Sequence, residues 1–190
     1  MAAVDQPFAC SCGALSGYVS AHGIKNGTRA VCYCADCRAG VLYLGQPDPA
    51  PGPVDVFQTS PDSVKITQGA EHLRLMRLGP KGLFRWYASC CNSPLANTLA
   101  KPTLPFAGLH SDRFANKDAL GRIRVRGSVP QPGKPPKTKG AAAMALGIIS
   151  RMATSRMSGR WRQTPFFDVE TGLPVAKPEI PSKEERAKLY

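Results

Sequence analysis

The chain lacks the short motifs that mark several large enzyme classes. It contains no HExxH pattern, no phosphate-binding P-loop and no G-x-S-x-G nucleophile turn. Histidine is scarce as well: only His22, His72 and His110 are present, and their positions show no metal-ligand spacing. We therefore expect none of the histidines to bind a metal, and any metal chemistry has to come from other side chains.

Long hydrophobic runs are also missing. The first ten residues carry only scattered apolar side chains, which does not fit an apolar targeting segment. The longest apolar run, Ala141–Ile149, is nine residues, whereas a membrane-spanning helix needs about 20. We expect no membrane span and a cytoplasmic location, where reduced cysteines bind metal instead of forming disulfides.

Acidic residues are few, with 13 Asp and Glu against 25 Lys and Arg, which gives a net charge of +12. Residues 1–100 carry 8 basic and 6 acidic groups, and residues 101–190 carry 17 and 7, so the excess lies in the second half. This asymmetry indicates either a solvated basic surface or a partner such as nucleic acid. Base stacking has little support, because Phe114 is the only aromatic residue in 111–160.

Cysteine, proline and glycine are the residues that dominate instead. Pro and Gly number 18 each, which favours short strands and turns over long helices. The seven cysteines cluster as two, three and two along the chain, unlike an evenly spread disulfide framework. A hydrophobic content of 43% is sufficient for a core.

The central cluster is Cys32-x-Cys34-x-x-Cys37. Only one pair in so short a stretch could close a disulfide, whereas one soft divalent metal satisfies all three thiolates, and zinc is the commonest such metal. Three protein ligands with one open position are typical of catalytic zinc, and four of structural zinc. Cys10 and Cys12 form a second pair, with Gly13 permitting the sharp turn that brings both thiolates to one metal. Cys90 and Cys91 form the third.

Alternating and β-branched runs predict short strands, with the central cysteines on a tight loop after one of them. The expected strands are 14–20, 29–33, 54–58, 63–68, 72–78 and 83–88, with a further edge strand at 105–110. The resulting fold class is mainly β: a twisted, mostly antiparallel sheet held by zinc, with a C-terminal helix and an irregular extension.

The second half is expected to be less regular. In 121–126 arginines alternate with aliphatic residues and so share one face. Residues 130–140, rich in Pro, Gly and Lys, are expected to be a flexible linker, and 141–158 a helix that either docks on the sheet or binds a membrane surface or partner. The tail 177–190 is expected to be loose. The predicted division is a zinc-binding domain at 1–129 with its core at 8–110, the linker, and a basic helix with tail at 141–190.

Taken together, Cys10-x-Cys12-Gly13, Cys32-x-Cys34-x-x-Cys37-Arg38 and Cys91-Asn92-Ser93-Pro94-Leu95 resemble the glutathione-dependent formaldehyde-activating enzyme family, which also contains centromere protein V. The resemblance covers residues 8–110. It implies a β-tent fold with one or two Zn²⁺ ions. By this analogy Cys32, Cys34 and Cys37 hold a catalytic zinc, and Cys10, Cys12 and the late cysteines hold a structural one.

The late motif departs from the family pattern C-x-x-C-G-[ST]-P. Ala88 stands where the first cysteine is expected, and Asn92 replaces the glycine. Cys90 is the candidate for the missing ligand. A second departure is Tyr33, at a position where the family often has histidine.

The resemblance implies a carbon–sulfur lyase that adds glutathione or a similar small thiol to formaldehyde or another small aldehyde. Arg38 is the candidate to pair with a substrate carboxylate. Asp36 would either orient a water or thiol or cap its own loop. The alternative is a non-catalytic zinc module, in which the central site gains a fourth ligand such as Cys90 and the basic half binds nucleic acid or another partner.

Overall fold

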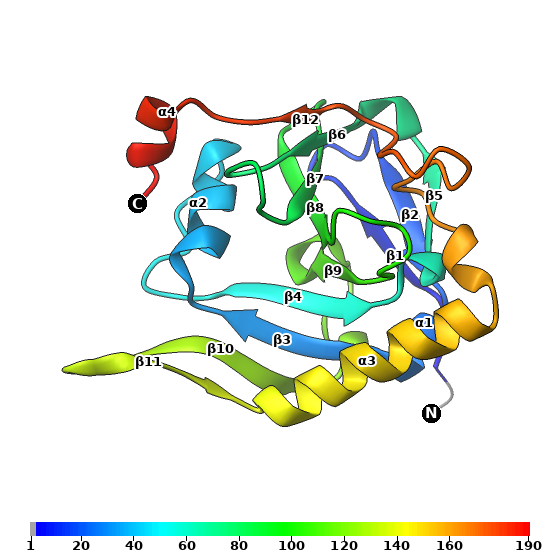
Figure 1. Ribbon diagram of the computed structural model, residues 1–190, viewed down its shortest axis with the longest axis horizontal. Coiled ribbons are helices and arrows are strands. Elements are labelled where there is room, and N and C mark those ends of the chain that lie inside the picture. The colour runs from blue at the N-terminus through cyan, green and yellow to red at the C-terminus, as the bar shows by residue number, and fades with distance from the viewer. Residues whose placement is uncertain (1–2) are drawn as a thin grey trace.

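A computed structural model describes residues 3–190 and shows a mainly β protein with a C-terminal helix, as predicted (Figure 1). Twelve strands form two sheets. The strands are β1 (Gln6–Ala9), β2 (Ser16–Val19), β3 (Thr28–Cys32), β4 (Val54–Thr59), β5 (Val64–Gln68), β6 (Leu73–Met76), β7 (Phe84–Ala88), β8 (Ser93–Thr98), β9 (Ala107–His110), β10 (Ile123–Gln131), β11 (Lys134–Lys139) and β12 (Pro178–Glu179).

Four α-helices and several 3₁₀ turns connect the strands. The α-helices are α1 (Ala21–Asn26), α2 (Ala35–Tyr43), α3 (Ala141–Met157) and α4 (Lys183–Ala187). The 3₁₀ turns are η1 (Pro61–Ser63), η2 (Ala70–His72), η3 (Ser111–Arg113), η4 (Asp118–Leu120) and η5 (Arg160–Arg162). No helix in 3–190 is long and apolar enough to cross a membrane.

The small sheet has the order β1-β2-β5, and the large sheet has the order β11-β10-β3-β4-β9-β8-β7-β6-β12. All neighbours are antiparallel except β10 with β3 and β12 with β6. The main core lies between one face of the large sheet and the small sheet, because alternate residues such as Phe57, Trp86 and Leu109 point to that side. Helices α2 and α3 cover parts of the opposite face, where Val41 and Met144 pack against the β3–β4–β10 region.

Most of the predicted strands are confirmed. The expected strands at 14–20, 29–33, 54–58, 63–68, 72–78 and 83–88 correspond to β2 to β7, with ends displaced by a few residues. The strand at 105–110 forms as β9, but it lies between β4 and β8, so its assignment to a sheet edge was wrong. The helix over 141–158 forms as α3 and docks on the sheet.

The expected linker at 130–140 is wrong. Residues 123–139 form a β-hairpin, β10–β11, which adds two strands to the large sheet, and Gly133 turns the chain between them with φ +65°. Proline disfavours interior strands because it cannot donate a ladder hydrogen bond. Here Pro135 and Pro136 lie on β11, at the edge of the sheet, where that loss is tolerated.

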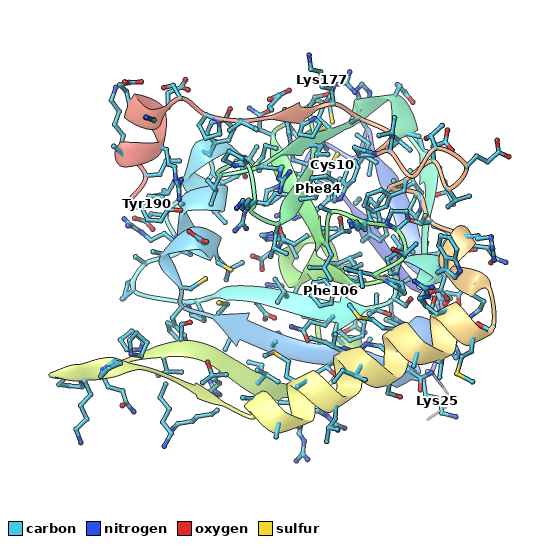
Figure 2. The ribbon with its side chains drawn as sticks, in the orientation of Figure 1. Cys10, Lys25, Phe84, Phe106, Lys177 and Tyr190 are labelled. Atoms are coloured by element: carbon cyan, nitrogen blue, oxygen red, sulfur yellow. The ribbon has the colours of Figure 1, made fainter. Side chains whose placement is uncertain are left out.

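The tail is more ordered than predicted. Strand β12 pairs with β6, and α4 begins with a capping box in which Ser182 and Glu185 satisfy each other's backbone N–H groups. Tyr190, at the chain end, donates a hydrogen bond to Asp36 on α2 (Figure 2). The C-terminal segment therefore returns to the part of the fold that carries the central cysteines.

Candidate metal centres

The first candidate metal centre is a group of four cysteines from two turns that meet at one end of the fold. Cys10 and Cys12 lie in the turn between β1 and β2, and Cys90 and Cys91 in the turn between β7 and β8. Gly13 has φ +79°, and its N–H donates to the Cys10 carbonyl over 3.1 Å, which is the sharp turn that the sequence predicts. The strands on both sides thus hold all four thiols in place.

The sulfur positions fit a tetrahedral metal. The Sγ···Sγ distances are 3.5 Å for Cys10–Cys12, 3.7 Å for Cys10–Cys90, 3.3 Å for Cys12–Cys90 and 3.9 Å for Cys90–Cys91. All four Sγ atoms lie within 4.8 Å of one another. A zinc ion with sulfurs at about 2.3 Å spaces them about 3.8 Å apart, so little rearrangement is needed to hold one.

The structure shows where the two unusual residues of the late cysteine motif, Ala88 and Asn92, lie. Ala88 is fully buried in β7 and faces the main core, so it lies outside the cysteine group. Cys90 takes the place of the missing ligand, which makes the group Cys10, Cys12, Cys90 and Cys91. Asn92 has φ +53°, a left-handed conformation that favours glycine and that asparagine adopts more readily than most residues.

Ser93 connects the four-cysteine group to its surroundings through hydrogen bonds. Its Oγ accepts a hydrogen bond from the Ser11 N–H over 3.0 Å and one from Arg113 Nη1 over 3.1 Å, and it lies 3.1 Å from Cys91 Sγ. Burial raises the pKa of Cys91, but hydrogen bonds from Ser11 and Ser93 outweigh this and bring that pKa to about 5. The polar surroundings thus favour a thiolate at Cys91, the form that binds a metal.

The second candidate metal centre is the triad of Cys32, Cys34 and Cys37. Cys32 ends β3, Cys34 is the N-cap of α2, and Cys37 lies in the first turn of that helix. The three Sγ atoms lie within 4.8 Å of one another, and Cys32 and Cys34 are 3.3 Å apart. The residues predicted to share a metal are therefore together, but on a helix N-terminus and not on a loop.

The neighbouring thiols, helped by the helix, favour ionisation of Cys34. Hydrogen bonds from the Cys32 and Cys37 thiols lower the pKa of Cys34 to about 2. Cys34 Sγ also accepts a hydrogen bond from the Cys37 N–H over 3.4 Å, and the N-terminal end of a helix favours negative charge. The pKa of Cys32 is raised chiefly by Cys34, and that of Cys37 by Cys32 and Cys34, so a bound metal would favour the thiolate forms of these two residues.

No fourth His, Cys, Asp or Glu in 3–190 joins the triad. Cys90, the fourth ligand suggested for a closed site, lies with the other group, so that part of the alternative is wrong. Asp36 is engaged by Tyr190. Arg38, expected to meet a substrate carboxylate, forms two hydrogen bonds with Asp48, at 2.8 Å and 2.6 Å, so a substrate would have to compete with that carboxylate.

Arg85 is the cation near the triad that the sequence analysis missed. It lies on β7 with 8% of its surface exposed, directly beneath α2, where a Cβ on Gly40 would be 3.0 Å from Arg85 Nη1. Its only side-chain hydrogen bond in the described residues is to Asn97 Oδ1 at 3.5 Å, and no carboxylate pairs with it. After the thiol hydrogen bonds, its charge contributes to the lowered pKa of Cys34. An arginine in the otherwise apolar run Phe84–Ala88 was the available signal.

A cavity of about 390 Å³ lies beside α2, lined by sequence neighbours of the cysteines and not by the cysteines themselves. Val41, one helical turn from Cys37, and Val54, paired with Cys32, form part of its wall. Pro94, His110 and Arg113 form the side nearer to the four-cysteine group. His110 is buried, and burial together with the charges of Arg85 and Arg113 lowers its pKa to about 4, so it is neutral at pH 7.

Comparison with known proteins identifies a family of unknown function. The model of a family described as "Family of unknown function (DUF6151)" matches residues 1–179. No curated protein matches the sequence. A structural-genomics crystal structure of a Rhodobacter sphaeroides protein is similar at 18% sequence identity and a TM-score of 0.42, over 62% of this chain and 96% of that one.

Proposed function

Since this chain belongs to the DUF6151 family, a family of unknown function, we propose its function from its own cysteine groups together with the resemblance of their motifs to the glutathione-dependent formaldehyde-activating enzymes: a zinc-dependent addition of a small thiol to a small aldehyde. The reaction is that of a carbon–sulfur lyase in its synthetic direction. The thiol sulfur forms a bond to the carbonyl carbon, the C=O π bond breaks, and the thiol proton ends on the oxygen. Atoms and electrons balance without an oxidant or reductant.

The observation that carries this proposal is the difference between the two cysteine groups. One offers four sulfurs and the other three, with no further His, Cys, Asp or Glu beside it in residues 3–190. Closed four-sulfur sites are typical of structural zinc, and three-ligand sites leave a position for water or substrate. We therefore assign Cys10, Cys12, Cys90 and Cys91 to a structural zinc and Cys32, Cys34 and Cys37 to a catalytic one.

Zinc held by the triad would lower the pKa of a bound thiol and polarise a carbonyl oxygen. The protein contributes the surroundings. Cys34 is ionised first and so begins metal capture, while the N-terminus of α2 and the Arg85 guanidinium favour negative charge nearby. Arg85 has no carboxylate partner among the described residues, so its buried charge is left to act on the triad thiolates.

The cavity beside α2 limits the substrate to a small molecule. Its volume of about 390 Å³ lies near the lower end of the range for ligand pockets. Its wall combines apolar Val41 and Val54 with Arg113 and with the carboxylates of Asp48 and Asp112, so the wall alone does not select a thiol that carries a carboxylate, such as glutathione. Seven free cysteines require a reducing compartment, which supports a cytoplasmic location.

Metal content and activity of matched variants test the proposal. Wild-type protein is expected to bind two zinc ions per chain, and X-ray absorption to show seven sulfurs shared by the two, with a lighter atom completing the triad site. Cys34→Ser should lower zinc content at the triad, keep the fold, and abolish the catalysed exchange between ¹³C-formaldehyde and its glutathione adduct observed by NMR. Cys12→Ser removes one sulfur from the four-cysteine group. We expect it to lower thermal stability more than it lowers activity.

Four sulfurs at every zinc would close the triad site and remove the chemistry of the enzyme proposal. So would full thiol–aldehyde activity in Cys34→Ser. The non-catalytic zinc module would then be the better proposal.

That second candidate is favoured by one observation, the basic β10–β11 hairpin. Its side chains Arg124, Arg126, Lys134, Lys137 and Lys139 are exposed on the edge of the large sheet. Such a surface would bind phosphates with an affinity that falls steeply with salt. Labelled DNA and RNA are titrated at several salt concentrations against the wild type and against a variant in which Lys134, Lys137 and Lys139 are changed to Glu. Weaker binding by the variant would indicate a nucleic-acid partner, and no binding by either would indicate a solvated basic surface.

A further inference from the structure

A cavity of about 310 Å³ lies at the other end of β3 from the triad. It is formed by α1, the end of β4, η1, α3 and the start of η5. Every residue lining it is either a glycine or carries a hydrogen-bonding side chain, and none carries a carboxylate. Two of them, Arg151 and Arg160, carry guanidinium groups.

Arg151 is the feature of this cavity that requires an explanation. The residue is 9% exposed, and its Nη1 donates to the Asn26 carbonyl over 3.0 Å and to Thr28 Oγ1 over 3.2 Å. Its Nη2 is buried and has no hydrogen-bond partner, and burial lowers the pKa of the guanidinium. A buried charge without a counter-charge is costly, so such a group usually faces an anion.

The nearby carboxylate does not supply that counter-charge. Asp62 accepts hydrogen bonds from Arg160 Nε at 3.1 Å, from Ser155 Oγ at 2.9 Å and from Ser60 Oγ. Its charge is thus matched by Arg160, and no ion pair within residues 3–190 includes Arg151. The cavity keeps one excess positive charge.

Glycine makes room for this guanidinium. A Cβ on Gly147 of α3 would lie 3.1 Å from Arg151 Nη1, and one on Gly23 of α1 would lie 2.5 Å from the Ser63 Cβ. Larger side chains at these two positions would crowd Arg151 and the serine wall. The two glycines therefore keep the wall of the cavity free of further side chains beside Arg151 and Ser63.

We propose that this cavity binds a small molecule through a carboxylate or phosphate group, held by Arg151 with the Ser150 and Ser63 hydroxyls. Arg151 Nη1 is already engaged by Asn26 and Thr28, so Nη2 is the donor that such a group would satisfy, with a charge-assisted hydrogen bond. Thr28 and Cys32 mark the two ends of β3, about 13 Å apart along the strand. The site is therefore separate from the triad and does not depend on the function proposed for it.

Thermal unfolding of the zinc-loaded full chain tests the proposal. Inorganic phosphate and succinate are each titrated against sodium chloride at equal ionic strength. We expect one of them to raise the midpoint with saturation, and its identity to distinguish a phosphate-bearing ligand from a carboxylate-bearing one. In Arg151→Met the same anion should bind about tenfold more weakly or worse.

Arg156→Gln is the matched control, because it removes one positive charge from the same helix at an exposed position outside the cavity. It should keep the anion response of the wild type. Equal weakening in Arg151→Met and Arg156→Gln would mean non-specific attraction and would overturn the proposal, as would a wild type that responds only as it does to chloride.

Ser150→Asp keeps the test valid if Arg151→Met does not fold. Ser150 is exposed and lines the cavity, so the new carboxylate would supply the missing counter-charge. We expect a higher unfolding midpoint without added anion and no further rise with it. A lower midpoint together with an unchanged anion response would contradict the assignment.

Discussion

Asn92 shows how one residue adapts the late cysteine turn. Its φ of +53° places it in the left-handed region, directly after two cysteines of the four-cysteine group. For residues other than Gly, Asn and Asp this conformation costs conformational energy, because Cβ approaches the following carbonyl oxygen. The backbone shape that glycine provides in the related motif is therefore kept here by asparagine.

Asn92→Ala is expected to lower the free energy of unfolding by about 1 kcal/mol. It should also speed zinc release from the four-cysteine group, because the turn that aligns Cys90 and Cys91 becomes strained. Denaturant unfolding and zinc transfer to a coloured chelator measure the two effects. Asn92→Gly is the control and should be neutral in both, and an equal loss in the two variants would show that the amide, and not the backbone angle, is what matters.

For individual residues, the sequence predicted the candidate metal ligands but did not predict the charged residues that surround the sites. Cysteine spacing predicted the triad, because one metal satisfies three thiolates that close together, whereas the joining of Cys10 and Cys12 with the late pair was implied by the family resemblance. The spacing could not assign Cys90 with certainty, since that depends on how the turn after β7 is shaped. Arg85 and Arg151 were missed because their importance lies in burial and in a missing partner, which only the tertiary structure reveals.

Among the elements, α2 and the β10–β11 hairpin differ most from expectation. Apolar residues in 35–43 show no clear helical periodicity. The helix forms because Cys34 caps its N-terminus and because its own Val41 and the C-cap Leu44 are buried against the rest of the fold. The hairpin forms on the sheet edge despite its prolines. In both cases long-range packing decides the conformation, and local composition does not.

Helix α3 is fixed by polar contacts more than by its apolar residues. Leu146, Ile149 and Met157 are exposed, whereas Arg151 and Ser155 are buried. Ser155 Oγ donates to Asp62 over 2.9 Å. Burial raises the pKa of Asp62, but hydrogen bonds from Ser60, Ser155 and Arg160 outweigh this and lower it, so the carboxylate is charged.

Ser155→Ala should therefore lower the free energy of unfolding by about 1.5–3 kcal/mol, the range for hydrogen bonds to charged groups. Ser158→Ala is the control: Ser158 is exposed at the end of the same helix and bonds only to backbone carbonyls of its own helix. Chemical denaturation measures both. If the two variants lose the same stability, α3 is not fixed through Asp62.

For the whole molecule, the two halves of the chain cannot be separated. Strand β10 pairs with β3, and β12 pairs with β6. Phe166 packs on Trp86 with ring centroids 5.1 Å apart, and Phe167 stacks on Phe84 at 6.0 Å. The basic second half is thus built into the same core as the cysteine groups, a relation that contacts between distant residues create and that local patterns do not indicate.

His110 links this core to pH. Its pKa is lowered from 6.5 to about 4 by burial and by the charges of Arg85 and Arg113, which outweigh the opposite effect of Asp112 and Asp55. Below pH 6.5 the His110 imidazole is protonated in the unfolded chain, whereas in the folded protein it stays neutral down to about pH 4. The stability linked to His110 is therefore fully present above pH 6.5 and is lost as the pH falls toward 4.

The gap between the two pKa values corresponds to a loss of about 3 kcal/mol in the free energy of unfolding, at about 1.4 kcal/mol per pH unit. Loss of a metal bound at the proposed centres would also destabilise the protein in acid, because protons compete with the metal for the cysteine ligands. The difference between wild type and His110→Gln separates the two effects, since both proteins carry the same cysteines. Denaturant unfolding between pH 8 and pH 4, with zinc measured at each pH, should show a shallower dependence in the variant, and parallel curves would mean that acid acts through the metal centres alone.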